Sequence, residues 1–165
     1  MVQRSMSRVL VTGTVFAALA LDGAVAWAAD EPANIVKYRQ NFMKANSAHL
    51  GMIAAIVKGE VSLTDEIAPH AEALAEQGKL ASANLQQLFP EGTGKGAAGI
   101  ETHALPVIWE QWDEFEQAAQ NFEEESAKLA EVAAGGDMTA IAQQVGAFGK
   151  NACGGCHEDF REKQD

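Results

Sequence analysis

The sequence predicts an all-α protein, and three observations support this class. Apolar residues recur at intervals of three and four over several long stretches after residue 31, which is the spacing of one face of an α-helix. No stretch alternates apolar and polar residues for long enough to form a half-buried strand. Glycine and proline gather between the periodic stretches, where they favour turns and end helices. We therefore expect successive helices and no sheet.

The first helix is expected over residues 32–58. Its apolar residues share one face, and Gly59 follows as a residue suited to a helix C-terminal stop. The expected inward stripe consists of Ile35, Tyr38, Phe42, Leu50, Ile53 and Val57.

The second helix is expected to begin at the run Thr-Asp-Glu at residues 64–66 and to continue to about Phe89. The side-chain oxygens of that run suit the free amides of a first turn. Pro69 lies in or near this turn, where proline is tolerated. Gly78 is expected to loosen the middle of the helix.

A long loop is expected at residues 90–99, because this segment contains four glycines and a proline. A third helix then starts near Pro106, a residue favoured in a first turn, and ends at the glycine pair 135–136. Asp137 is expected to cap a fourth helix that reaches about Phe160. Its inward stripe consists of Ile141, Val145, Phe148, Ala152, Cys156 and Phe160. The pattern predicts an antiparallel, up-down four-helix bundle.

The N-terminal segment has the order of a secretory signal peptide. Arg4 and Arg8 precede an apolar run at residues 9–21, and Ala-Trp-Ala at residues 26–28 is a suitable cleavage site. The apolar run is too short to span a membrane, although a retained anchor is the alternative. We expect residues 1–28 to be the signal and residues 29–165 to be one domain, exported to the periplasm without stable membrane insertion after cleavage.

The charge balance excludes one class of partner. The chain has 12 basic and 23 acidic residues and a formal net charge of −11. Such a surface repels nucleic acid and favours solubility and basic partner surfaces.

Both cysteines of the chain fall in one motif, Cys153-Gly-Gly-Cys156-His157. Cys-x-x-Cys-His is the attachment pattern of c-type haem. On a helix, positions three and four apart share a face, so two thiols can anchor one porphyrin while the histidine ligates its iron. Two alternatives remain: a redox disulfide between the cysteines, and a chance cluster in a haem-free helical thiol protein.

Further motifs accompany this one. They are the signal peptide, Lys-Tyr-Arg-Gln at residues 37–40 with Met43 and Lys44, Pro-x-Ile-Trp at residues 106–109, and Arg161 four residues after the motif histidine. With them the chain resembles the class II cytochromes c, the cytochrome c′ family, over essentially the whole mature sequence. The resemblance implies one covalent haem c in a four-helix bundle. It allows a homodimer through the first two helices.

The resemblance also assigns roles. Cys153 and Cys156 become the thioether sites and His157 the proximal iron ligand. Arg161 resembles the family's arginine beside the proximal imidazole, its alternative being a solvated basic residue near a helix end. Arg39 matches an arginine near a haem propionate.

Three further residues are candidates around the haem. Gln40 follows Arg39 and is a second candidate contact. We expect Thr93 to border the haem from the long loop. Met43 corresponds to the family's distal position, which faces the iron from the side opposite the proximal histidine.

The role of Met43 decides the function that the resemblance implies. If its sulfur binds iron, the His/Met pair serves electron transfer; if it only packs nearby, the iron is five-coordinate and open to small gases such as nitric oxide. Family members with methionine here include both kinds, and the run at residues 42–51 is closer to the Met-ligated, low-spin kind. We therefore expect a monohaem one-electron carrier with unidentified redox partner proteins, and not an enzyme. The five-coordinate cytochrome c′ is the alternative.

Other residues that could ligate iron have less favourable positions. Met52 and Met138 lack the family position and are expected in the core. His49, His70 and His103 are expected to be surface histidines or to have other partners, because none shares the face of Met43 or a suitable helix.

Overall fold

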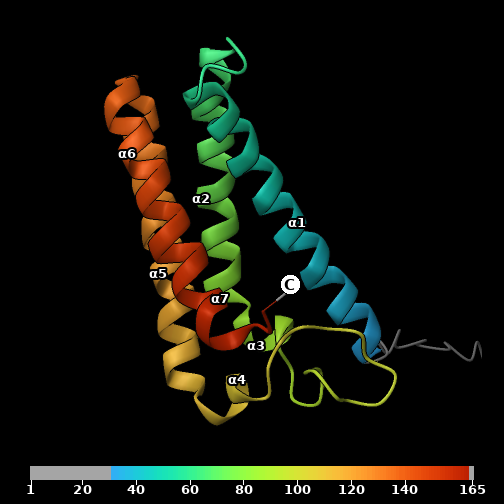
Figure 1. Ribbon diagram of the computed structural model, residues 1–165. Helices are drawn as coiled ribbons and strands as arrows, with labels where there is room; N and C mark the ends of the chain where they lie inside the picture. The colour runs from blue at the N-terminus through green and yellow to red at the C-terminus, as the bar shows by residue number, and fades with distance from the viewer. Residues whose placement is uncertain (1–30, 164–165) are drawn as a thin grey trace, which may run out of the picture.

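The computed structural model describes residues 31–163 (Figure 1). The expected signal peptide and its cleavage site lie outside these residues. Four long helices form the bundle: α1 (Pro32–Val57), α2 (Ile67–Ala83), α5 (Trp112–Ala134) and α6 (Met138–Phe148). Successive long helices run in opposite directions (Figure 1). The predicted all-α, up-down bundle is confirmed; within the described residues the only β pairing is an isolated bridge between Ala104 and Arg161.

Short elements complete the chain at both ends of the bundle. The 3₁₀-helix η1 (Thr64–Glu66) leads into α2. Helices α3 (Leu85–Leu88), α4 (Val107–Glu110) and α7 (Gly155–Phe160) gather at one end, together with the loop between α3 and α4 (Figure 1). The π-helical segment η2 (Gly149–Gly154) joins α6 to α7.

Two helix ends match their predicted signals. Gly59 adopts a φ of 74°, the left-handed conformation that glycine permits at a helix C-terminus. The carboxylate of Asp137 accepts hydrogen bonds from the Thr139 and Ala140 amides at 2.9 and 3.4 Å. These local interactions fix where α1 stops and where α6 starts.

Three predicted helices are interrupted. The second breaks at Asn84, whose side-chain amide donates to the Leu80 carbonyl at 2.9 Å and so binds a carbonyl at the end of α2. The third breaks at Gln111, where φ is −126° and ψ is 55°. The fourth widens into η2 before α7. Each interruption lies at or next to the end of the bundle where α3, α4 and α7 gather (Figure 1).

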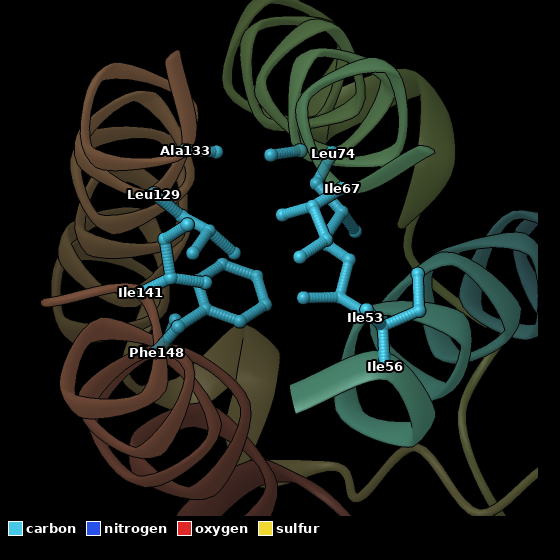
Figure 2. Packing of buried hydrophobic residues seen from close by; sticks show 10 residues of the cluster. Ile53, Ile56, Ile67, Leu74, Leu129, Ala133, Ile141 and Phe148 are labelled. Carbon is cyan, nitrogen blue, oxygen red and sulfur yellow. The ribbon is translucent and has the colours of Figure 1, made fainter. Parts of the chain in front are cut away.

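One buried cluster joins all four long helices, as Figure 2 shows. It includes Ile53 and Ile56 of α1, Ile67 and Leu74 of α2, Leu129 and Ala133 of α5, and Ile141 and Phe148 of α6. A second cluster, at the end that carries α7, consists of Leu85, Leu88, Phe89, Ile108, Phe115 and Phe160. The ring of Phe115 stacks edge-on with those of Phe89 and Phe160, at centroid distances of 4.8 and 5.1 Å. Aromatic packing therefore holds the end of α7 against α5.

The buried face of α1 differs from the predicted stripe. It consists of Val36, Arg39, Asn46, Ile53 and Ile56, whereas Tyr38 is 63% exposed. Two polar residues occupy buried positions, and apolar periodicity cannot reveal such positions.

None of the described helices is both long and apolar enough to cross a membrane.

Gly78 permits a close approach and does not merely loosen α2. A Cβ atom at this position would lie 2.4 Å from Ser126 Oγ and 2.9 Å from Glu123 Cα. The absence of a side chain therefore lets the backbones of α2 and α5 approach each other.

Candidate haem site

The Cys-x-x-Cys-His motif spans two kinds of helix. Cys153 lies in η2, whereas Cys156 and His157 lie in α7. Both cysteines are free thiols and partly buried. Cys153 packs against the cluster that joins the four long helices, and Cys156 packs against the cluster around Phe115. The motif therefore lies where the two clusters meet. The wide π turn, a form often found at functional sites, was not predicted from the sequence.

The electrostatics of the thiols argue against a redox role. Burial raises the pKa of the Cys156 thiol to about 11, with smaller contributions from Cys153 and Asp159. Burial also raises the pKa of Cys153. Redox-active Cys-x-x-Cys motifs have lowered thiol pKa values, because the thiolate is the reactive form. Both thiols of this pair instead have raised pKa values, which disfavours the thiolate form.

His157 is suited to ligate a metal. Burial lowers the pKa of its imidazole, and the charge of Arg161 lowers it further. The ring is therefore neutral at pH 7, the form that binds metals. Among the described residues, no hydrogen bond engages either ring nitrogen.

Arg161 follows α7 and is exposed. Its backbone pairs with Ala104, and two flanking hydrogen bonds extend this pairing: Leu105 N to Phe160 O at 3.0 Å and Glu162 N to His103 O at 2.8 Å. We call these contacts the C-terminal clasp. The clasp fastens the residues after His157 to the segment that precedes α4.

Arg39 is a buried cation on α1, with 3% of its surface exposed. Its guanidinium donates to the Leu88 carbonyl at 3.2 Å, to both oxygens of Thr93 at 2.8 and 2.5 Å, and to Thr102 Oγ1 at 3.2 Å. It also lies 4.6 Å from the centroid of the Phe89 ring. Burial lowers the pKa of Arg39 to about 10, so it stays charged at pH 7.

This cation has no acidic partner among the described residues, in which every ion pair involves a lysine or histidine. An uncompensated buried charge is costly, and a haem propionate would supply the missing negative charge. Arg39 therefore fits the group that the motif implies.

Gln40 follows Arg39 in the chain, and Thr93 accepts hydrogen bonds from Arg39. Gln40 Nε2 donates to the Glu101 carbonyl at 2.9 Å. Thr93 is 1% exposed, and its hydroxyl also donates to the Pro90 carbonyl at 2.7 Å. Thr93 is therefore a hydrogen-bond partner of Arg39, a role that the sequence did not predict.

Met43 interrupts the buried face of α1. It lies four residues after Arg39 and three before Asn46, so the three side chains share one side of the helix. Arg39 and Asn46 are 3% and 9% exposed, yet Met43 is 40% exposed. An exposed apolar side chain between two buried side chains is expected where a bulky apolar group covers that face of the helix.

Asn46 supports the same conclusion. Neither its amide nitrogen nor its amide oxygen has a hydrogen-bond partner, although both atoms are buried. Buried polar atoms without partners are uncommon and call for an explanation such as a water molecule or a bound group. We could not have predicted this residue from the apolar periodicity.

The other histidines have partners elsewhere. His49 Nδ1 and His70 Nδ1 lie 3.1 Å apart, and His103 Nδ1 lies 3.1 Å from Glu162 Oε2. Met52 and Met138, expected in the core, are 41% and 36% exposed. That expectation is wrong because Met52 lies outside the buried face of α1 and Met138 is the first residue of α6.

Fold and site together define a class of protein, a four-helix bundle with a c-type haem attachment motif across η2 and α7. The family model for "Cytochrome C'" matches residues 34–161. Cytochrome c′ from Pararhodospirillum photometricum is 39% identical over 132 residues, which cover 79% of this chain and 98% of the relative. The chain belongs to the cytochrome c′ family and carries covalent haem c; its two cysteines fit the attachment pattern.

Solved structures agree in fold. The nitric oxide complex of a mutant cytochrome c′ from Alcaligenes xylosoxidans has a TM-score of 0.66 and 29% identity, and the match covers 81% of this chain and 98% of that one. A cytochrome c′ with ligand-controlled dimer dissociation has a TM-score of 0.74 and 26% identity, and the match covers 82% and 100%.

Proposed function

We propose that the chain is an exported cytochrome c′ whose haem iron, ligated by the protein only through His157, binds small gases such as nitric oxide. The family match supports this proposal most strongly. The state of the four histidines, all of which lie in the described residues, argues against a second histidine ligand. Three have other side-chain partners, and His157 alone makes no hydrogen bond through its ring. The related nitric oxide complex supports the choice of ligand.

When bound, the haem would supply an iron that can bind a small gas; the protein's own residues would hold the haem and tune the iron. Cys153 and Cys156 would form the thioether bonds. His157 would donate its neutral imidazole nitrogen to the iron. Arg161 would place a positive charge near that imidazole, which lowers the basicity of the ligand.

The α1 residues would hold the other parts of the group. Arg39 would neutralise a propionate, since it is charged and has no carboxylate partner in the described residues. Gln40 is placed to add a neutral hydrogen bond. Met43 would pack against the haem and exclude water from the iron.

Electron transfer is the second candidate function. It rests on the exposure of Met43 between two buried residues of the same helix face, where its sulfur is free to bind iron. In that case redox proteins would be the partners, and a His/Met pair would raise the reduction potential. Neither function makes the protein an enzyme.

One optical experiment separates the two functions. Spectra of the purified holoprotein are recorded in the ferric and ferrous states, before and after addition of nitric oxide and carbon monoxide. A high-spin ferric spectrum with immediate gas binding supports the proposal. A low-spin ferric spectrum with a sulfur-to-iron band in the near infrared supports electron transfer and overturns it.

Export and assembly need their own measurements. We propose periplasmic localisation after cleavage at Ala28, which mass spectrometry of the secreted chain tests; a product that retains residues 9–21 would contradict it. We also include a homodimer in the proposal, following the relative whose dimer dissociation is ligand-controlled. Analytical ultracentrifugation with and without carbon monoxide tests this.

A further inference from the structure

Two histidines outside the haem motif face each other across α1 and α2. His49 lies in α1 and His70 lies in the first turn of α2. Their Nδ1 atoms are 3.1 Å apart, and their rings have a centroid distance of 5.2 Å and an interplanar angle of 55°. Both side chains are partly exposed, so an ion from solvent has access to them. The haem proposal uses neither residue.

The distance between the two nitrogens matches that of two ligands on one metal ion. Imidazole nitrogens bind zinc at about 2.0–2.1 Å, which places two ligands of a tetrahedral ion about 3.3–3.4 Å apart and two adjacent ligands of a square-planar ion about 2.8–3.0 Å apart. The observed 3.1 Å lies between these values. A shift of a few tenths of an ångström, roughly the difference between these geometries, would therefore accommodate either ion.

We propose that His49 and His70 form a two-histidine site for a divalent transition metal of the copper, nickel or zinc class. Imidazole nitrogen is a preferred ligand for these ions. Among the described residues no group of three or more His, Cys, Asp or Glu side chains could hold a metal, so water completes the coordination shell. The ion links α1 to α2.

The proton balance of binding is simple. A hydrogen bond between the two Nδ1 atoms requires Nδ1–H on one ring and an Nδ1 lone pair on the other. Metal binding needs both Nδ1 lone pairs, so the shared proton moves to the Nε2 atom of its own ring. Two neutral rings therefore take up the ion without net proton release.

The test uses the untagged holoprotein and titrates it with zinc chloride, and separately with copper sulfate, by isothermal calorimetry. We expect one site per chain, at least tenfold weaker in both His49→Asn and His70→Asn. His103→Asn is the matched control and should bind as the wild type does. Absence of binding by the wild type, or equal binding by His49→Asn, overturns the proposal.

A second measurement does not depend on the folding of any variant. Electron paramagnetic resonance of the wild-type holoprotein with one equivalent of copper should show coupling to two nitrogen ligands. Coupling to no nitrogen or to one overturns the site. The haem absorption spectrum should not change on metal addition, which separates this site from the iron; a changed spectrum would place the metal at the haem and also overturn the proposal.

Discussion

The guanidinium of Arg39 binds both oxygens of Thr93, at 2.8 Å to the hydroxyl and 2.5 Å to the carbonyl. Arg39 of α1 thereby holds in place Thr93, a residue of the loop that follows α2 and α3 in the chain. A further bond to Thr102 Oγ1 extends this hold to the segment before α4. The buried guanidinium of Arg39 therefore anchors the long loop to α1.

Replacement of Arg39 by leucine should reduce the free energy of unfolding by about 2 kcal/mol, because the Leu88 and Thr93 carbonyls lose a charged donor. Urea unfolding of the holoprotein measures this. Arg39→Lys keeps the charge but not the fork of donors, so it should recover only part of the loss. A leucine variant as stable as the wild type would contradict the anchoring role.

Replacement of Gly78 by alanine should destabilise the bundle by about 1–3 kcal/mol, because the added Cβ meets the backbone of α5 at Glu123. Thermal unfolding measures the change. Gly51→Ala is the matched control: a Cβ there meets nothing within 4 Å, so helix propensity alone should stabilise α1 by about 0.5–1 kcal/mol. Equal effects at the two positions would contradict the close approach of α2 and α5.

In the haem-free chain, Cys156 should react with iodoacetamide about tenfold more slowly when folded than in urea. At pH 8 a thiol with a pKa of about 11 has about 0.1% thiolate, against about a quarter for an ordinary thiol, and the higher nucleophilicity of the rarer thiolate offsets part of this difference. Mass spectrometry of quenched samples gives the two rates.

The sign of the same shift predicts a pH dependence of stability. The folded state binds the Cys156 proton more tightly than the unfolded state does, so this contribution is fully present below the pKa of the unfolded thiol. It is lost as the pH rises towards about 11. Urea midpoints of the haem-free chain should fall over that range, and less so in Cys156→Ala. A pH-independent difference between the two chains would exclude the shift.

Replacement of Met43 by alanine should leave the ferric spectrum high-spin and accelerate carbon monoxide binding about tenfold, which corresponds to roughly 1.4 kcal/mol of barrier. Met43 is proposed to pack beside the iron, so its removal would open the path of the gas to the iron. Met52→Ala, an exposed methionine of the same helix, should change neither property. Stopped-flow spectroscopy measures both. A wild-type low-spin spectrum that becomes high-spin in Met43→Ala would instead identify the methionine as a ligand.

Much of the fold could be predicted because its signals are local. The Asp137 cap and the Gly59 stop depend on neighbouring residues only, and both are observed. The haem cofactor was likewise predictable, since all three residues of the Cys-x-x-Cys-His attachment pattern lie within five consecutive positions. Breaks at Asn84 and Gln111 carry no comparable signal and depend on how the end of the bundle closes.

The remaining features depend on contacts between distant parts of the chain. Apolar periodicity assigned α1 a face that includes Tyr38, whereas tertiary packing buries Arg39 and Asn46. Arg39 is stable there because residues beyond α2 receive its hydrogen bonds. The His49–His70 contact has the same origin: only the antiparallel pairing of α1 with α2 brings the two rings together.

The C-terminal clasp has a consequence for the order of events during folding. It joins residues 160–162 to residues 103–105, across the whole length of α5 and α6. Contacts between residues so far apart in the chain form slowly, because the entropy of loop closure is lost before the contacts stabilise the fold. We therefore expect α7 to dock after the long helices have paired. Until then we expect Cys153 and Cys156 to be more accessible than in the folded chain, where both are partly buried, so haem attachment should be fastest before the fold is complete.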